Sequence, residues 1–173
     1  VVRSPDTKRR VHAAFAKAHA EAAGMFEGDR RATYQKLKLE GIIESPIGIC
    51  ITCDRERTGP VVVGRTHMKT MDLYSSVCAV QNLWLAARAE HLGLGWVSLF
   101  EPGDLHTLLA LPAGAVPLGL LCIGPVDRFY ETPLLIQQQW RQARPVPALF
   151  TENNWAPARN THTRPTPAQP LHS

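Results

Sequence analysis

Apolar residues near the start of the chain recur once per helical turn. Val11, Phe15 and Ala18 carry this repeat, which predicts an amphipathic helix over residues 7–24. Asp6 directly precedes the predicted helix, and its side chain is of a type that caps helix N-termini. The pattern therefore indicates a helix that packs one apolar face against the rest of the protein.

Two further helices follow from the same kind of spacing. Tyr34 and Leu37 lie on one stripe of a helix predicted over residues 29–40. The longest helix is predicted over residues 72–92, with Asp72 as its cap, and thirteen of these 21 residues are apolar. A helix that is apolar on most sides is buried, so we expect this one in the core or in a subunit interface.

Three apolar segments have the pattern of β-strands. Residues 47–53 alternate large and small side chains, while residues 94–100 and 116–124 are short apolar runs. Ser98 supplies a hydroxyl group to an otherwise apolar strand. A buried hydroxyl without a partner costs about 1–3 kcal/mol, so we expect Ser98 either to bond a neighbouring carbonyl group or to face a ligand pocket.

The chain changes character after Pro125. Prolines interrupt it repeatedly and leave room for one short helix over residues 134–141. Such a segment lacks a core of its own, and we expect it to extend over another surface, such as a partner subunit. Residues 151–173 are polar and rich in proline, which predicts a disordered tail. Residues 1–150 are therefore expected to form one domain.

The composition is that of a globular protein. Of the 173 residues, 45% are hydrophobic and 20% are charged, close to the average for globular domains. The net charge of +4 is spread over short groups of lysine and arginine, which suits a solvated surface better than a nucleic-acid site. It also suits a phosphorylated small molecule. Gln81, Asn82 and Arg88 interrupt the longest apolar stretch, so no transmembrane helix is expected.

Cys50 and Cys53 have the CxxC spacing that is typical of zinc sites and redox dithiols. Within a strand, however, side chains three positions apart point to opposite faces, and no second pair follows at zinc-finger spacing. We therefore expect neither a metal site nor a redox dithiol here. Four thiols without a disulfide framework fit a reducing cytoplasm.

Several motifs together resemble one enzyme family. They are the run from Met71 to Glu90, the Gly-Leu-Gly-Trp-Val-Ser segment at 93–98, and the shorter stretches 37–42, 63–67 and 121–130. This combination resembles the BluB branch of 5,6-dimethylbenzimidazole synthases, within the flavin-dependent nitroreductase superfamily. The resemblance covers roughly residues 1–150, and the long helix with the glycine-rich strand alone would indicate only the superfamily.

The resemblance implies an α+β fold whose central, mainly antiparallel sheet is flanked by helices. It implies an obligate homodimer with the long helix in its interface, an extended C-terminal arm and FMN between the subunits. In the implied reaction, reduced FMN is the substrate and O₂ the co-substrate. The flavin ring becomes 5,6-dimethylbenzimidazole, the lower ligand of cobalamin, and the ribityl part leaves as erythrose 4-phosphate. A separate flavin reductase would supply reduced FMN, and the pocket must exclude water.

The resemblance also assigns roles to four residues. Ser98 matches a catalytic serine beside the flavin ring, and the backbone of Val97 is expected to contact the flavin. Leu37 lies in a segment that matches the family's lid and is expected to touch the flavin. Arg141 matches an arginine of the C-terminal arm near the FMN phosphate, although relatives often carry the second arginine one position earlier than Arg144. An arginine-rich phosphate-binding segment, a catalytic Asp and a further flavin-contacting serine are expected upstream of the sequence given.

Two other functions are compatible with the same residues. One is an NAD(P)H-dependent flavin or nitro reductase of the same fold, or a reductase of cobalt corrinoids. The other is a catalytically impaired remnant that lacks the upstream arginines. Two charge-assisted hydrogen bonds are worth about 3–6 kcal/mol, so their loss would weaken FMN binding by roughly 10² to 10⁴.

Overall fold

A three-stranded antiparallel sheet organises the protein. The computed structural model describes residues 1–101 and 103–153. The strands are β1 (Ile47–Asp54), β2 (Leu92–Val97) and β3 (Ala115–Pro125), with β3 in the centre and antiparallel to both neighbours. Val2 adds a short antiparallel bridge to Gly48 at the β1 edge. β1 and β3 lie within one residue of the predicted strands, and β2 overlaps only the first part of the third.

The chain divides into two compact units, Val1–Glu131 and a second that begins at Thr132. The sheet belongs to the first unit. The expected single domain over residues 1–150 stays a prediction. Within the described ranges, no helix combines the length and the apolar character needed to cross a bilayer.

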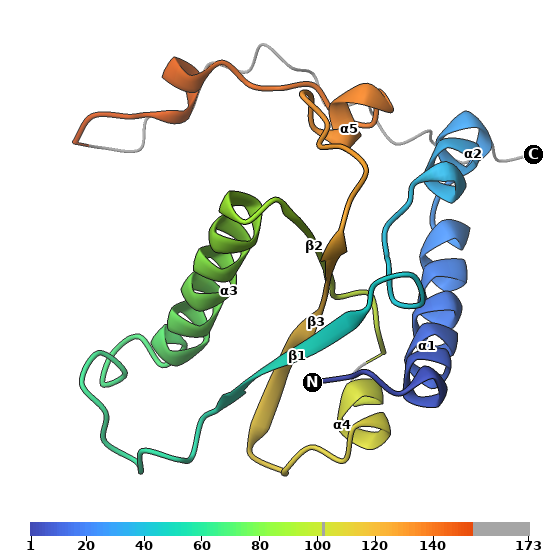
Figure 1. Cartoon of the computed structure of the whole chain (residues 1–173). Helices are drawn as coiled ribbons and strands as arrows, with labels where there is room; N and C mark the ends of the chain where they lie inside the picture. The colour runs from blue at the N-terminus through green and yellow to red at the C-terminus, as the bar shows by residue number, and fades with distance from the viewer. Residues whose placement is uncertain (102, 154–173) are drawn as a thin grey trace, which may run out of the picture. The chain divides into compact units, whose positions relative to one another are not determined.

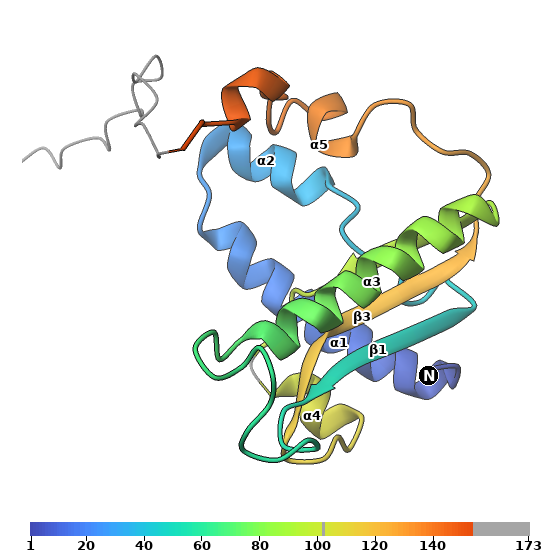
Figure 2. The same cartoon turned by 90° about the vertical axis from the view of Figure 1, so that its left-hand side faces the viewer.

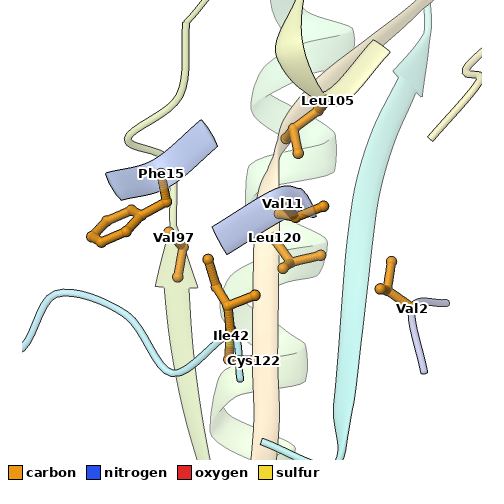
Figure 3. Packing of buried hydrophobic residues seen from close by; sticks show 8 residues of the cluster. All are labelled: Val2, Val11, Phe15, Ile42, Val97, Leu105, Leu120 and Cys122. Carbon is orange, nitrogen blue, oxygen red and sulfur yellow. The ribbon is translucent and has the colours of Figure 1, made fainter. Parts of the chain in front are cut away.

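Helices cover both faces of the sheet in the first unit. α3 (Met71–Ala89) crosses one face, while α1 (Pro5–Gly24) and α4 (Asp104–Leu108) cover the other (Figures 1 and 2). A cluster of buried apolar side chains fills the space between the sheet and α1 (Figure 3). Its members are Val2, Val11, Phe15, Ile42, Val97, Leu105, Leu120 and Cys122.

α1 begins two residues before the predicted start. Ser4, not Asp6, is the N-cap, and its Oγ accepts a hydrogen bond from the Thr7 N–H at 3.4 Å. Pro5 occupies the first helical position, where a missing N–H costs nothing. The carboxylate of Asp6 instead pairs with Arg9 one turn later, at 3.4 Å.

α2 (Gly28–Lys36) ends four residues before the predicted end. Its last bond runs from the Leu37 N–H to the Tyr34 carbonyl oxygen at 3.0 Å, and Leu37 itself has an extended backbone. Ile42, five residues further along, is buried in the core cluster under α1. Tyr34 and Leu37 are both buried, as expected of residues on one stripe. The helix that was predicted to contain them ends earlier than expected.

The boundary between α3 and β2 also differs from the prediction. α3 starts at Met71, so Asp72 lies in its first turn and is not the cap. The helix ends at Ala89 because His91 adopts a left-handed backbone with φ of 56°, the conformation expected of Gly93. β2 therefore starts and ends earlier than predicted and leaves Ser98 outside the strand.

The second unit contains little regular structure among its described residues. α5 (Leu134–Gln137) is shorter than the predicted helix 134–141, because Gln139 has a positive φ of 54°. A 3₁₀ turn, η1 (Val146–Leu149), follows. Neither element contains a buried residue, as expected of a segment without its own core. Most of the predicted tail, residues 154–173, lies outside the described residues.

Candidate functional site

Ser98 lies one residue beyond the end of β2 and is exposed. The prediction of a buried strand hydroxyl is wrong, because β2 pairs with β3 only as far as Val97. The carbonyl oxygen of Ser98 accepts a hydrogen bond from the Phe100 N–H at 3.1 Å, which bends the chain immediately after the strand. This bend leaves the Ser98 side chain at the wall of a small cavity.

The cavity beside Ser98 has a volume of about 140 Å³. Segments from the end of β2, the start of α4 and the middle of β3 form its walls. The lining residues are Ser98, Phe100, Glu101, Gly103, Leu105, Pro117, Leu118 and Gly119. Ser98 is thus one of the residues that line this cavity, and its role beside a flavin stays a prediction.

A bulge in β3 shapes the cavity wall. The register between β1 and β3 shifts at Leu118, whose carbonyl oxygen accepts a hydrogen bond from Trp96 Nε1 at 2.9 Å. Gly119 follows with φ of 130°, and a Cβ atom there would lie 2.6 Å from the carbonyl oxygen of Val97. Only glycine fits this position, so the backbone beside Ser98 has a defined shape. An isolated glycine inside an apolar strand was a sequence signal for this bulge.

The turn after Ser98 is held by hydrogen bonds between Glu101 and Asp104. The Glu101 N–H donates to Asp104 Oδ2, and the Asp104 N–H donates to the Glu101 carbonyl oxygen, both at 3.1 Å. His106 Nε2 lies 2.6 Å from the carbonyl oxygen of Ala115 and connects α4 to β3. Glu101 thus shares the cavity with Ser98, although no motif in the sequence pointed to it.

The other predicted site residues lie in different surroundings. The Val97 side chain is buried in the core cluster, so only its backbone is available to a ligand. Leu37 is buried at the end of α2 and does not line the Ser98 cavity. Arg141 belongs to the second unit, where it and Arg144 line an open hollow. Of the four predicted residues, Ser98 alone lines this cavity, and neither Leu37 nor Arg141 is among its lining residues.

A charge cluster that the sequence analysis missed connects the loop before α3 to that helix. Asp72 Oδ2 lies 3.0 Å from Arg55 Nε and 3.3 Å from Arg65 Nη1, and Arg55 also donates to the Lys69 carbonyl oxygen. Burial alone would raise the pKa of Asp72. The hydrogen bonds from Arg55 and from the Leu73 N–H, with the charges of both arginines, outweigh burial and lower this pKa.

Two of the four cysteines, Cys50 and Cys122, lack the surroundings of reactive thiols. Burial raises the pKa of Cys50 and of Cys122, which keeps both thiols protonated at neutral pH. Among the residues that the structure describes, no group of three or more His, Cys, Asp or Glu side chains is arranged to hold a metal ion.

Known proteins are similar to this chain in sequence and in fold. The family model of the nitroreductase family matches residues 1–125. This chain belongs to the nitroreductase family. Its α+β fold is also similar to that of a nitroreductase family protein from Clostridium difficile 630. The TM-score is 0.50 and the sequence identity 17%, over 66% of this chain and 63% of that one. The fold that the motifs implied is thereby confirmed.

Two curated relatives are more similar in sequence. The 5,6-dimethylbenzimidazole synthase of Rhodospirillum rubrum is 35% identical over 135 residues, which are 78% of this chain and 64% of the relative. The 5,6-dimethylbenzimidazole synthase of Rhodobacter capsulatus is 35% identical over 145 residues, 84% of this chain and 70% of the relative. These matches confirm the resemblance found in the motifs. The chain spans about two thirds of the length of these relatives.

The Ser98 cavity is small compared with typical ligand sites. Pockets for ligands of drug size typically measure about 300–1,000 Å³, whereas this cavity measures about 140 Å³. A whole flavin does not fit inside it. A flavin site at Ser98 therefore requires surfaces beyond this cavity.

Proposed function

We propose that this chain acts in the synthesis of 5,6-dimethylbenzimidazole, with reduced FMN as substrate and O₂ as co-substrate. The observation that carries the proposal is the 35% identity to two curated 5,6-dimethylbenzimidazole synthases over most of this chain. When bound, reduced FMN would supply both the electrons for O₂ and the carbon skeleton of the product. A separate flavin reductase would deliver it in the reduced state.

Ser98 is the residue of this chain that we assign to the flavin ring. Its side chain is exposed at the cavity wall, where its hydroxyl group is free to donate or accept a hydrogen bond. The bulge at Gly119 and the turn at Glu101 hold the surrounding backbone, so the serine does not need to be ordered when a ligand binds. Leu37 and Arg141 are proposed to contact the flavin from other surfaces.

The missing surfaces are proposed to come from a second copy of the chain. α3 buries only Val80 and Ala87. Its outer side exposes the large apolar side chains Tyr74, Val77, Trp84 and Leu85. Exposed apolar patches of this kind mark interaction sites, which supports a homodimer with α3 in its interface. The segment after Thr132 would extend over the partner subunit as an arm.

The test is to look for the product and for loss of the flavin together. The chain is mixed with FMN, NADH and a flavin reductase in air, and 5,6-dimethylbenzimidazole is measured by mass spectrometry. We expect product to form as flavin disappears, and Ser98→Ala to reduce the rate by about 100-fold or more. NAD(P)H oxidation by the chain alone, with the flavin intact, would instead identify a reductase. Failure to bind FMN would identify a remnant.

A further inference from the structure

Residues 37–45, here called the 37–45 loop, are held together by their own charged side chains. Lys38 Nζ lies 2.7 Å from Glu40 Oε1 and 2.6 Å from Glu44 Oε1. The Ser45 N–H donates to the Gly41 carbonyl oxygen at 2.9 Å, which closes one tight turn. The loop therefore has internal bonds that do not depend on a ligand.

Glu40 is the centre of this arrangement. Its side chain is only 9% exposed, and both carboxylate oxygens are used. Oε1 binds Lys38, while Oε2 accepts the Ile42 N–H at 2.7 Å. Ile42 is 1% exposed and points into the core cluster (Figure 3). One buried carboxylate thus connects a surface lysine to a residue of the core.

The far end of the loop is attached to α1, and so is α2, which precedes the near end. At the far end, the buried Lys8 donates from Nζ to the Ser45 carbonyl oxygen. At the near end, the ring of Tyr34 stacks on His19, with ring centroids 4.9 Å apart and planes 17° from parallel. The backbone between these two anchors carries Leu37, whose side chain is 7% exposed. The position of Leu37 therefore depends on the conformation of the loop.

We propose that Glu40 is a positioning residue that holds the 37–45 loop, and with it Leu37, in the flavin-binding conformation before the flavin arrives. This rests on the proposed function, in which Leu37 contacts the flavin. A preformed loop lets a ligand bind without the entropy cost of ordering it. Glu40 acts through Leu37 and is not expected to touch the flavin.

The first experiment needs no flavin. Amide hydrogen exchange is measured at Ile42 and Ser45 in the whole chain. Glu40→Gln removes the charge that binds Lys38, and charge-assisted hydrogen bonds of this kind correspond to about 10-fold to 100-fold in an equilibrium. We expect exchange at both amides to accelerate by that factor, and by more in Glu40→Ala, which removes both acceptors.

The matched control is Glu21→Gln. Glu21 pairs with Lys17 at 4.0 Å on the exposed side of α1, so the same chemical change there should leave loop exchange unaltered. Unchanged exchange in Glu40→Gln would overturn the proposal. An equal acceleration at the Leu121 amide in the sheet would also overturn it, because the effect would then be global unfolding.

The second experiment adds FMN to the Glu40→Gln variant. If the ordered loop is the state that binds flavin, FMN at 100 times its dissociation constant should slow exchange at Ile42 about 100-fold. Binding of FMN without such slowing would overturn the link between Glu40 and the flavin. Absence of FMN binding to the unaltered chain would contradict the proposed function instead, while the exchange of Ile42 would still decide the role of Glu40 in the loop.

Discussion

The two faces of the sheet differ in how the helix that covers each of them is buried. Under α1 and α4, eight buried residues form a continuous cluster. On the other face, α3 is more apolar than α1, yet it buries only Val80 and Ala87 and leaves Trp84 and Leu85 exposed. The α1 face is therefore closed within one chain, whereas the α3 face presents the apolar surface that a partner would cover.

This difference shows what apolar patterning means along a helix. The inner stripe of α3 packs on the sheet, where Leu121 of β3 is completely buried. A single sheet can bury only one side of a helix. Packing on the sheet therefore does not explain why the remaining sides of α3 are also apolar. The predictions below test whether the α1 face is the stable core and the α3 face an interface.

The largest loss of stability is expected from a substitution in the core cluster under α1. Leu120 is 1% exposed and lies in the core cluster. Leu120→Ala should lower the free energy of unfolding by about 2–5 kcal/mol, because it removes buried methyl groups and leaves a cavity. Val63→Ala serves as the control, since Val63 is fully exposed and its truncation should change stability by less than about 0.5 kcal/mol. Urea denaturation measures both, and equal losses would contradict this assignment of the core.

The second effect concerns the α3 face. Leu85 is 60% exposed in the single chain, so Leu85→Lys should leave the fold of one chain intact. If α3 forms the interface of a homodimer, the buried charge should weaken dimerisation by about 100-fold or more. Analytical ultracentrifugation measures this change, and Met25→Lys is the control because Met25 is exposed at the end of α1. A dimer that survives Leu85→Lys unchanged would place the interface elsewhere.

The third prediction is a smaller loss of stability, and it tests whether the bulge at Gly119 is rigid. In Gly119→Ala, the new methyl group meets the Val97 carbonyl oxygen at 2.6 Å in a backbone conformation unfavourable to alanine. We expect a loss of about 1–3 kcal/mol in the free energy of unfolding. Gly95→Ala in the neighbouring strand is the matched control, since its methyl group meets no atom within 4 Å. A tolerated Gly119→Ala with an unchanged melting temperature would show that the wall is not rigid.

The elements with strong periodicity were predictable from the sequence, and their ends were not. Apolar spacing located α1, α3 and β3 to within a few residues. The end of β2 depends on its register with β3, which no local pattern reveals, so Ser98 was assigned to the strand and to the interior. Ser98 lines a small cavity, while its role beside a flavin stays a prediction that rests on the motifs.

The contacts between distant residues were beyond prediction for a physical reason. Glu40 is the last residue of a predicted helix, and its burial depends on where Ile42 enters the core. Arg55 and Asp72 are seventeen positions apart, and only the folded loop brings them together. Charged residues are mostly solvated, so sequence alone favours that interpretation for each of them.

The smallest effect is expected from pH and concerns Asp72 in the first turn of α3. The arginines around Asp72 lower its pKa from the ordinary value of 3.8, so the ionised form stabilises the folded state at neutral pH. This contribution is present above the ordinary value and is lost as the pH falls through the lowered pKa. Asp72→Asn should therefore be less stable than the unaltered chain at pH 7, and the difference in melting temperature should vanish at acidic pH. Asp6→Asn, which removes an exposed carboxylate of α1, should show no comparable difference. A difference that persisted in acid would contradict this account. The loss of a hydrogen-bond acceptor, and not of the charge that pairs with Arg55 and Arg65, would then explain the lower stability of Asp72→Asn.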